Sequence, residues 1–172
     1  LFELGFIKDF KQVSDTAVRA AQREGNQDAL LELLGLTGAM AGREQNEQKC
    51  REIWLQRLEI ARELNARAVE ADALSDLAWQ SFELQDFSLA TAYLDSSIQI
   101  ATEDNEIELL ATGLAMRARI LMKMGRPDEA DSALANVETL LPLCKDRGMT
   151  SFVYYSLAGA SLQREDLESA ER

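Results

Sequence analysis

The sequence predicts an all-α protein built from repeated helical hairpins, and three observations lead to this fold class. The 172 residues are rich in Leu, Ala, Glu, Arg and Gln, which favour helices, and contain only two prolines and nine glycines. No stretch alternates β-branched and polar residues as a strand would. Small and apolar residues recur every forty positions, a period typical of stacked supersecondary units. We therefore expect about nine helices.

The forty-residue register divides the chain into units of one repeat domain. Ala90, Ala130 and Ala170 stand one period apart, and Cys50 takes the same place one period earlier. Each of these alanines follows a pair of residues expected to interrupt a helix, namely Gln85-Asp86, Gly125-Arg126 and Glu165-Asp166. The register predicts a partial unit at 1–25, complete units at 26–65, 66–105 and 106–145, and a partial unit at 146–172.

The helices can be assigned along the chain from this register. Residues 1–25 are expected to hold the end of a first helix and a complete second helix. Each complete unit is expected to be a helical hairpin with a turn of two or three residues. Gly125 suits the left-handed residue that ends a helix, and Pro127 suits the first position of the next one. Residues 146–172 should supply a first helix and the opening turn of a second, so we expect the chain to be a fragment of a longer array.

The charge and the cysteines exclude several classes of function. The formal charge of −12, from 18 basic and 30 acidic side chains, makes nucleic acid and anionic membranes poor partners, because phosphate binding requires clustered Lys and Arg. No apolar stretch approaches the ~18 residues of a membrane span. We expect Cys50 and Cys144 to be free thiols that are not bonded to each other. Free thiols suit a reducing compartment, so we expect a cytoplasmic location.

Catalytic and cofactor signals are weak. The chain has no histidine, which removes the commonest general base and makes a zinc site unexpected. No glycine-rich phosphate-binding motif is present. Paired acids occur, but thirty carboxylates make such pairs inevitable by chance. We expect no enzyme, no metal and no cofactor.

The repeat resembles the tetratricopeptide repeat family, in which antiparallel helix pairs stack into a right-handed superhelix. The family places a small residue in the first turn of the second helix, where Ala90, Ala130 and Ala170 match and Cys50 is a conservative replacement. It also favours a Leu-small pair in the first helix, matched by Leu77-Ala78 and Leu157-Ala158. The forty-residue period is similar to the longer class found in Pins-type adaptors, kinesin light chains and bacterial signalling regulators. The resemblance implies a right-handed superhelical solenoid whose first helices line a concave groove.

The resemblance also implies which residues face that groove. An apolar and aromatic surface with an arginine is expected there, and such surfaces favour binding hot spots. The alternative, that these aromatic residues pack against the next helix, stays open. Residues 66–105 have one arginine against eight acidic side chains, so a partner of basic character is expected. The predicted groove residues are Asp72, Asp76, Trp79, Phe82, Glu83, Arg119, Met122, Lys123, Tyr155 and Leu162.

These observations together predict a non-catalytic scaffold that binds a protein or peptide in its groove. An alternative is a sensor or regulatory segment of a signalling protein or transcriptional regulator, in which the occupied groove controls an attached effector domain. A third possibility is self-association through exposed terminal hairpins.

Overall fold

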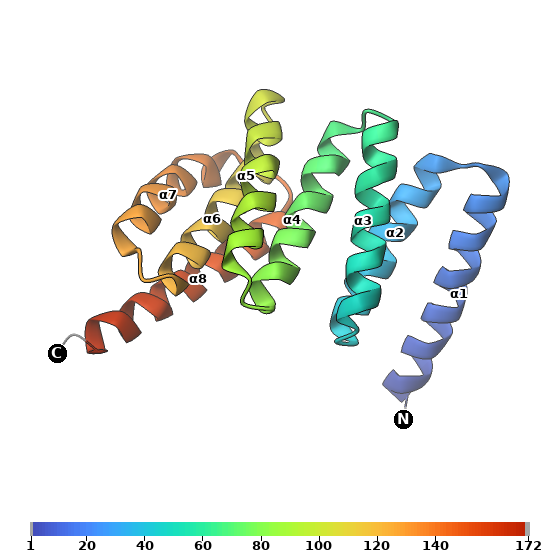
Figure 1. Ribbon diagram of the computed structural model, residues 1–172, viewed down its shortest axis with the longest axis horizontal. Coiled ribbons are helices and arrows are strands. Elements are labelled where there is room, and N and C mark those ends of the chain that lie inside the picture. Colours follow the sequence, from blue (N-terminus) through green and yellow to red (C-terminus); the bar gives the residue numbers. More distant parts are fainter. Residues whose placement is uncertain (1, 171–172) are drawn as a thin grey trace. The chain divides into compact units, whose positions relative to one another are not determined.

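The computed structural model is all-helical over the part it describes, which is the backbone of residues 2–170 and the side chains of residues 11–165. This confirms the all-α class. The described backbone holds eight α-helices and one short 3₁₀ helix, η1 (Figure 1). In chain order they are α1 (Phe2–Glu24), α2 (Gln27–Arg43), α3 (Glu47–Glu63), α4 (Arg67–Glu83), α5 (Phe87–Glu103), α6 (Ile107–Lys123), α7 (Pro127–Leu140), η1 (Leu141–Leu143) and α8 (Arg147–Ala170).

The helices are regularly spaced because each turn uses the same local chemistry. Helices α2 to α6 each have 17 residues and are joined by three-residue connections. Each connection has a residue with positive φ, a conformation that Gly and Asn tolerate best. The caps of α2, α3 and α5 use the side chains of Asn26, Asn46 and Asp86, which accept hydrogen bonds from backbone N–H groups at 3.1 Å. The positive-φ residues are Gly25, Gln45, Asn65, Gln85, Asn105 and Gly125.

Two predicted interruptions are wrong, which explains why eight α-helices are found rather than about nine. Helix α1 is continuous from Phe2 to Glu24, with no break between two helices. Helix α8 continues through Glu165-Asp166, where a turn was expected.

The chain forms two compact units, Leu1–Ala73 and Leu74–Arg172, and the boundary falls inside α4. In unit 1, α2 packs against α1 and α3. The ring of Trp54 lies directly over Gly38, where an added Cβ would come within 2.6 Å of the ring. Cys50 is buried here, as its place in the repeat predicts.

In unit 2, α6 is the central helix and packs against α5, α7 and α8 (Figure 1). Its core contains the small residues that mark the repeat, since Ala90 and Ala130 are both 0% exposed. Ala170, the third of the series, lies outside the described side chains. The Leu77-Ala78 pair of α4 is buried as well, together with Leu74 and Ser81 on the same helix.

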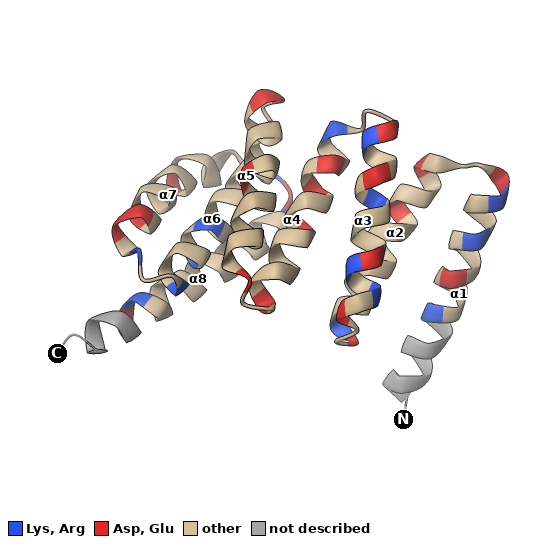
Figure 2. Cartoon of the chain, viewed as in Figure 1, with Lys and Arg blue, Asp and Glu red and all other residues tan. Residues whose placement is uncertain are grey.

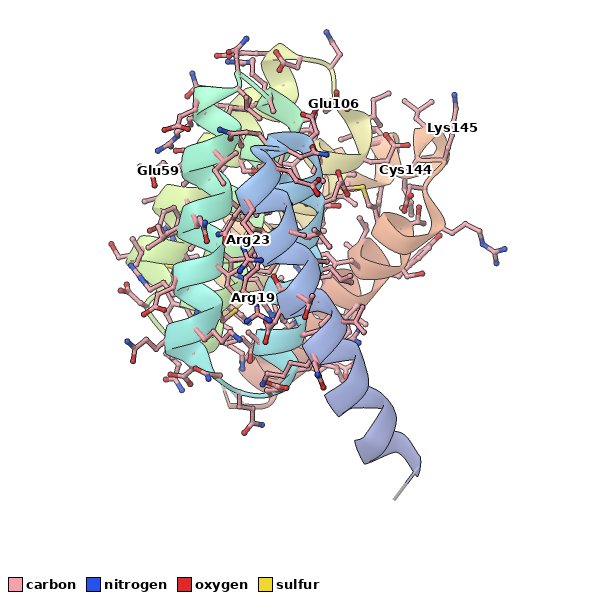
Figure 3. The ribbon with its side chains drawn as sticks, turned by 90° about the vertical axis from the view of Figure 1, so that its right-hand side faces the viewer. Arg19, Arg23, Glu59, Glu106, Cys144 and Lys145 are labelled. Carbon is pink, nitrogen blue, oxygen red and sulfur yellow. The ribbon has the colours of Figure 1, made fainter. Side chains whose placement is uncertain are left out.

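The two cysteines are free thiols. Cys144 is half-buried and follows η1, next to Lys145 (Figure 3). Burial raises the pKa of the Cys144 thiol, and the nearby carboxylate of Glu108 adds to this shift. Over the described residues, no helix has the length and apolar character needed to cross a membrane.

Candidate functional site

Aromatic side chains from two helices of unit 2, α4 and α8, gather into one connected group. Trp79 and Phe82 come from α4, with ring centroids 5.6 Å apart. Phe152 and Tyr155 come from α8, and their ring centroids lie 5.3 Å and 6.0 Å from that of Trp79. The Trp79–Phe152 contact is edge-to-face, a geometry that aromatic quadrupoles favour. Trp79 is therefore the ring that joins the α4 pair to the α8 pair.

Arg119 of α6 lies among these rings. Its guanidinium carbon is 4.9 Å from the ring centroid of Trp79, 5.0 Å from that of Phe82 and 4.8 Å from that of Tyr155. Each distance is within the ~6 Å range of a cation–π interaction. We call Trp79, Phe82, Tyr155 and Arg119 the Arg119 cluster.

The forty-residue register explains how Arg119 fits into this space. Trp79, Arg119 and Gly159 occupy equivalent positions on α4, α6 and α8. Because Gly159 has no side chain, the guanidinium can lie against its backbone. A Cβ added at Gly159 would be 3.0 Å from Nε of Arg119 and 3.3 Å from its guanidinium carbon. The missing side chain on α8 thus makes room for the cation on α6.

The charge of Arg119 has no counter-ion within the described side chains. Its Nη1 atom is buried and has no hydrogen-bond partner there. The three rings provide attraction to a cation, but they do not accept hydrogen bonds as a carboxylate or carbonyl would. A buried donor without a partner is rare in folded proteins and indicates a cost that something else offsets.

The predicted groove residues of unit 2 are exposed, half-buried or buried in the core. Tyr155 and Leu162 are 55% and 64% exposed, and Glu83 and Lys123 are exposed as well. Trp79, Arg119 and Asp76 are half-buried.

Two predicted groove residues need correction because they belong to the core. Met122 is 1% exposed and packs among Ala118, Ala130 and Ala160, since α7 and α8 both cover this part of α6. Phe82 is 6% exposed and lies in a cluster with Leu94 and other buried residues of α4 to α6. For these two residues the alternative left open by the sequence, packing inside the fold, is the one observed.

Several acidic residues of 66–105 already have partners within the chain. Asp72 pairs with Nη1 of Arg57 at 2.7 Å, and Glu70 pairs with Nε of Arg62 at 2.8 Å. Asp95 pairs with Arg117. Arg57 and Arg62 both belong to α3, along which charges of both signs alternate (Figure 2). Three of the eight acids expected to attract a basic partner are thus neutralised by arginines of the adjacent repeats.

Sequence reasoning missed two contributors to these sites. Phe87 of α5 contacts Phe82 in a tilted geometry, with ring centroids 5.9 Å apart. Arg57 is 7% exposed in unit 1, where its Nε donates to the carbonyl oxygen of Leu31 at 3.2 Å. A buried arginine leaves no signal in a helix that carries many charges.

Comparisons with known proteins support the fold but identify no family. No family model matches the chain, and no curated protein matches it. Among solved structures, the crystal structure of BtubC (BKLC) from P. vanneervenii is similar, with a TM-score of 0.71 and 17% sequence identity. The match covers 92% of this chain and 71% of that one. At this identity the likeness shows a shared fold alone.

Proposed function

We propose that this chain is a non-catalytic scaffold that binds a protein segment beside the Arg119 cluster, on the helices α4, α6 and α8 of unit 2. The observation that carries the proposal is the exposure of Tyr155 beside a half-buried tryptophan and an arginine that has no counter-ion among the described residues. Aromatic residues and arginine are the types that dominate binding hot spots.

The proposal includes a tetratricopeptide-like arrangement, in which the hairpins stack as a right-handed superhelical solenoid. Two features support it. Successive helices α2 to α6 begin twenty residues apart, so two helices make one forty-residue unit. The small residues Ala90 and Ala130 lie fully buried in the first turns of α5 and α7, where helices approach closely. In such a solenoid, α4, α6 and α8 are the first helices and line the concave side.

An extended peptide suits this surface better than a small molecule, because the exposed apolar side chains are spread along α8. The ring of Tyr155 offers apolar contact area at a small entropy cost, because only two torsions are ordered. Leu162 adds an apolar contact two turns further along α8. The basic partner expected from the charge of residues 66–105 remains a prediction, although three of the acids that motivated it are engaged within the chain.

The test compares two neighbouring tyrosines of nearly equal exposure. Tyr155 is 55% exposed and belongs to the Arg119 cluster, whereas Tyr154 is 56% exposed and makes no ring contact with it among the described residues. Tyr155→Ala should weaken binding of blocked decapeptides selected from a random library by about tenfold or more, and Tyr154→Ala should leave it unchanged. Equal effects of the two variants, with helical content intact by circular dichroism, would remove the site from this surface.

A further inference from the structure

We infer that the segment bound at this surface carries an acidic side chain whose carboxylate pairs with the guanidinium of Arg119. The inference rests on the proposed function and adds the chemistry of the ligand. Its starting point is the one arginine of unit 2 that lies among three aromatic rings and has no counter-ion in the described part of the chain.

Arg57 is an enclosed arginine of this chain whose guanidinium has both a hydrogen-bond acceptor and a carboxylate partner. It too lies over a tryptophan, with its guanidinium carbon 5.8 Å from the ring centroid of Trp54. It donates to a backbone carbonyl oxygen and pairs with a carboxylate. Arg119 has the rings and the enclosing glycine but neither of the two acceptors among the described residues. The group that is missing at Arg119 is therefore the one that Asp72 supplies to Arg57.

The surroundings of Arg119 prepare it for an acceptor. Three rings and the backbone of Gly159 lie around the guanidinium, so part of its side-chain entropy is already lost before pairing. A guanidinium presents parallel N–H groups that match the two oxygens of a carboxylate. Lys123, one helical turn further along α6, is exposed and forms no ion pair with a described side chain, so it adds positive charge on the same helix.

The field of the whole chain favours a single carboxylate over a more highly charged group. With a formal charge of −12, the protein repels anions at long range, and this repulsion grows with the charge of the ligand. One side-chain carboxylate gains the short-range pairing with Arg119 at the smallest cost of this kind. A phosphoryl group, with a charge of about −1.5 to −2 at neutral pH, meets stronger repulsion.

The experiment uses three pools of blocked decapeptides, acetylated at the N-terminus and amidated at the C-terminus, with Glu, Gln or Lys at the fifth position and random residues elsewhere. Binding of each pool is measured to the full chain. Three variants accompany it, Arg119→Gln, Arg119→Lys and the control Arg117→Gln. Arg117 lies two residues away on α6 and pairs with Asp95, so its replacement removes the same formal charge outside the Arg119 cluster.

We expect the wild type to retain the Glu pool about tenfold better than the Gln pool. Arg119→Gln should abolish this preference. Arg119→Lys should keep part of it, because the positive charge stays and only the two parallel N–H groups are lost. Arg117→Gln should retain it. A thermal melt of each variant tests whether it is folded. If Arg119→Gln is not folded, Arg119→Met replaces it.

The outcomes separate this inference from the proposed function. Equal retention of the three pools, still weakened by Tyr155→Ala, overturns the carboxylate and leaves the scaffold. Preference for the Lys pool also overturns the carboxylate and supports the basic partner. A Glu preference that persists in Arg119→Gln shows that the charge is recognised elsewhere. If no pool is retained, both proposals fail.

A fourth pool with phosphoserine at the fifth position distinguishes the two anions. Retention of this pool above the Glu pool, lost in Arg119→Gln, would overturn the choice of a carboxylate. Weaker retention than that of the Glu pool supports it.

Discussion

Arg57 in unit 1 and Arg119 in unit 2 have similar neighbours and different partners. Each guanidinium lies against a glycine of another helix, Gly35 or Gly159, and over a tryptophan ring. Arg57 also has the carboxylate of Asp72 and a backbone carbonyl oxygen, which leave it satisfied in the folded chain. Within the described residues Arg119 has only its rings, with Nη1 buried and unpaired.

The difference shows how the same residue in a similar enclosure can serve two purposes. A buried cation with its acceptors in place holds helices together, because removing it leaves the acceptors unpaired. We propose that a cation enclosed without acceptors contributes little to the fold and receives an acceptor from outside. The presence or absence of the carboxylate decides between these roles, and the enclosure does not.

Replacement of the two arginines by methionine should show the largest contrast. Arg57→Met should lower the free energy of unfolding by about 2–3 kcal/mol, less than for a fully buried pair because the Asp72 side chain is 42% exposed. Arg119→Met should change it by less than about 1 kcal/mol, because the lost cation–π attraction is offset by removal of an unpaired buried donor. Urea unfolding curves measure both values. Equal losses would contradict the distinction.

Alanine at the two enclosing glycines should act in opposite directions. An added Cβ at Gly35 would lie 3.2 Å from the guanidinium of Arg57, which cannot move without breaking its bonds to Asp72 and Leu31. Gly35→Ala should therefore cost about 1 kcal/mol despite the better helix propensity of alanine.

At Gly159 the neighbour is able to yield, because no hydrogen bond to a described residue fixes Arg119. Gly159→Ala should thus raise the free energy of unfolding by about 0.5 kcal/mol through helix propensity, while it displaces the guanidinium and weakens peptide binding. Thermal melts and the library assay measure the two effects. Destabilisation by Gly159→Ala larger than that by Gly35→Ala would mean that Arg119 is the more rigid of the two.

Removal of the acidic partner tests how much enclosure contributes to an ion pair. Asp72→Asn should lower stability by about 1 kcal/mol, because its partner Arg57 is buried. Asp95→Asn should lower it by less than about 0.5 kcal/mol, because the side chains of Arg117 and Asp95 are 35% and 51% exposed and solvent screens the pair. Urea unfolding at low and high salt separates the two. A loss at Asp95 as large as that at Asp72 would show that burial is not the cause.

The smallest expected effect concerns Glu108, a half-buried acidic residue of unit 2 whose carboxylate accepts a hydrogen bond from the backbone. The backbone N–H of Lys145 donates to Glu108 Oε1 at 2.9 Å and lowers the pKa of this carboxyl below its ordinary value of 4.5. A lowered folded-state pKa gives stability that is present above pH 4.5 and lost as the pH falls through the folded value. Glu108→Gln should therefore be slightly less stable than the wild type at pH 7 and equal to it at the acid end. If the free energies of unfolding of the wild type and Glu108→Gln differ by the same amount at every pH, the difference comes from packing and not from the charge of Glu108.

The positions of the turns were largely predictable from sequence, but two predicted turns are absent because α1 and α8 are continuous there. Gly125 and Pro127 mark the start of α7, and the turn at Gln85-Asp86 was located correctly although Gln85 has no special preference for positive φ. The pair Glu165-Asp166 has the same character as Gln85-Asp86 yet lies inside α8. The two pairs of residues are alike, so the local residues alone do not decide where a turn forms.

The candidate site was predictable in its location and only partly in its members. The register placed Phe82, Met122 and Leu162 at equivalent positions, yet they are 6%, 1% and 64% exposed. Each helix has a different set of neighbours, so the same position is covered in α4 and α6 and open in α8. Repetition in sequence therefore does not imply equal burial.

The sequence by itself determined the helices, most of their ends and the forty-residue register, because helix propensity, caps and left-handed turn residues act over a few neighbouring positions. Only the tertiary structure decided which repeated positions are core and which arginine has a partner. Asp72 reaches Arg57 across fifteen residues, and Trp79 and Gly159 reach Arg119 across forty. Contacts at such separations depend on how the helices pack, which no local pattern encodes.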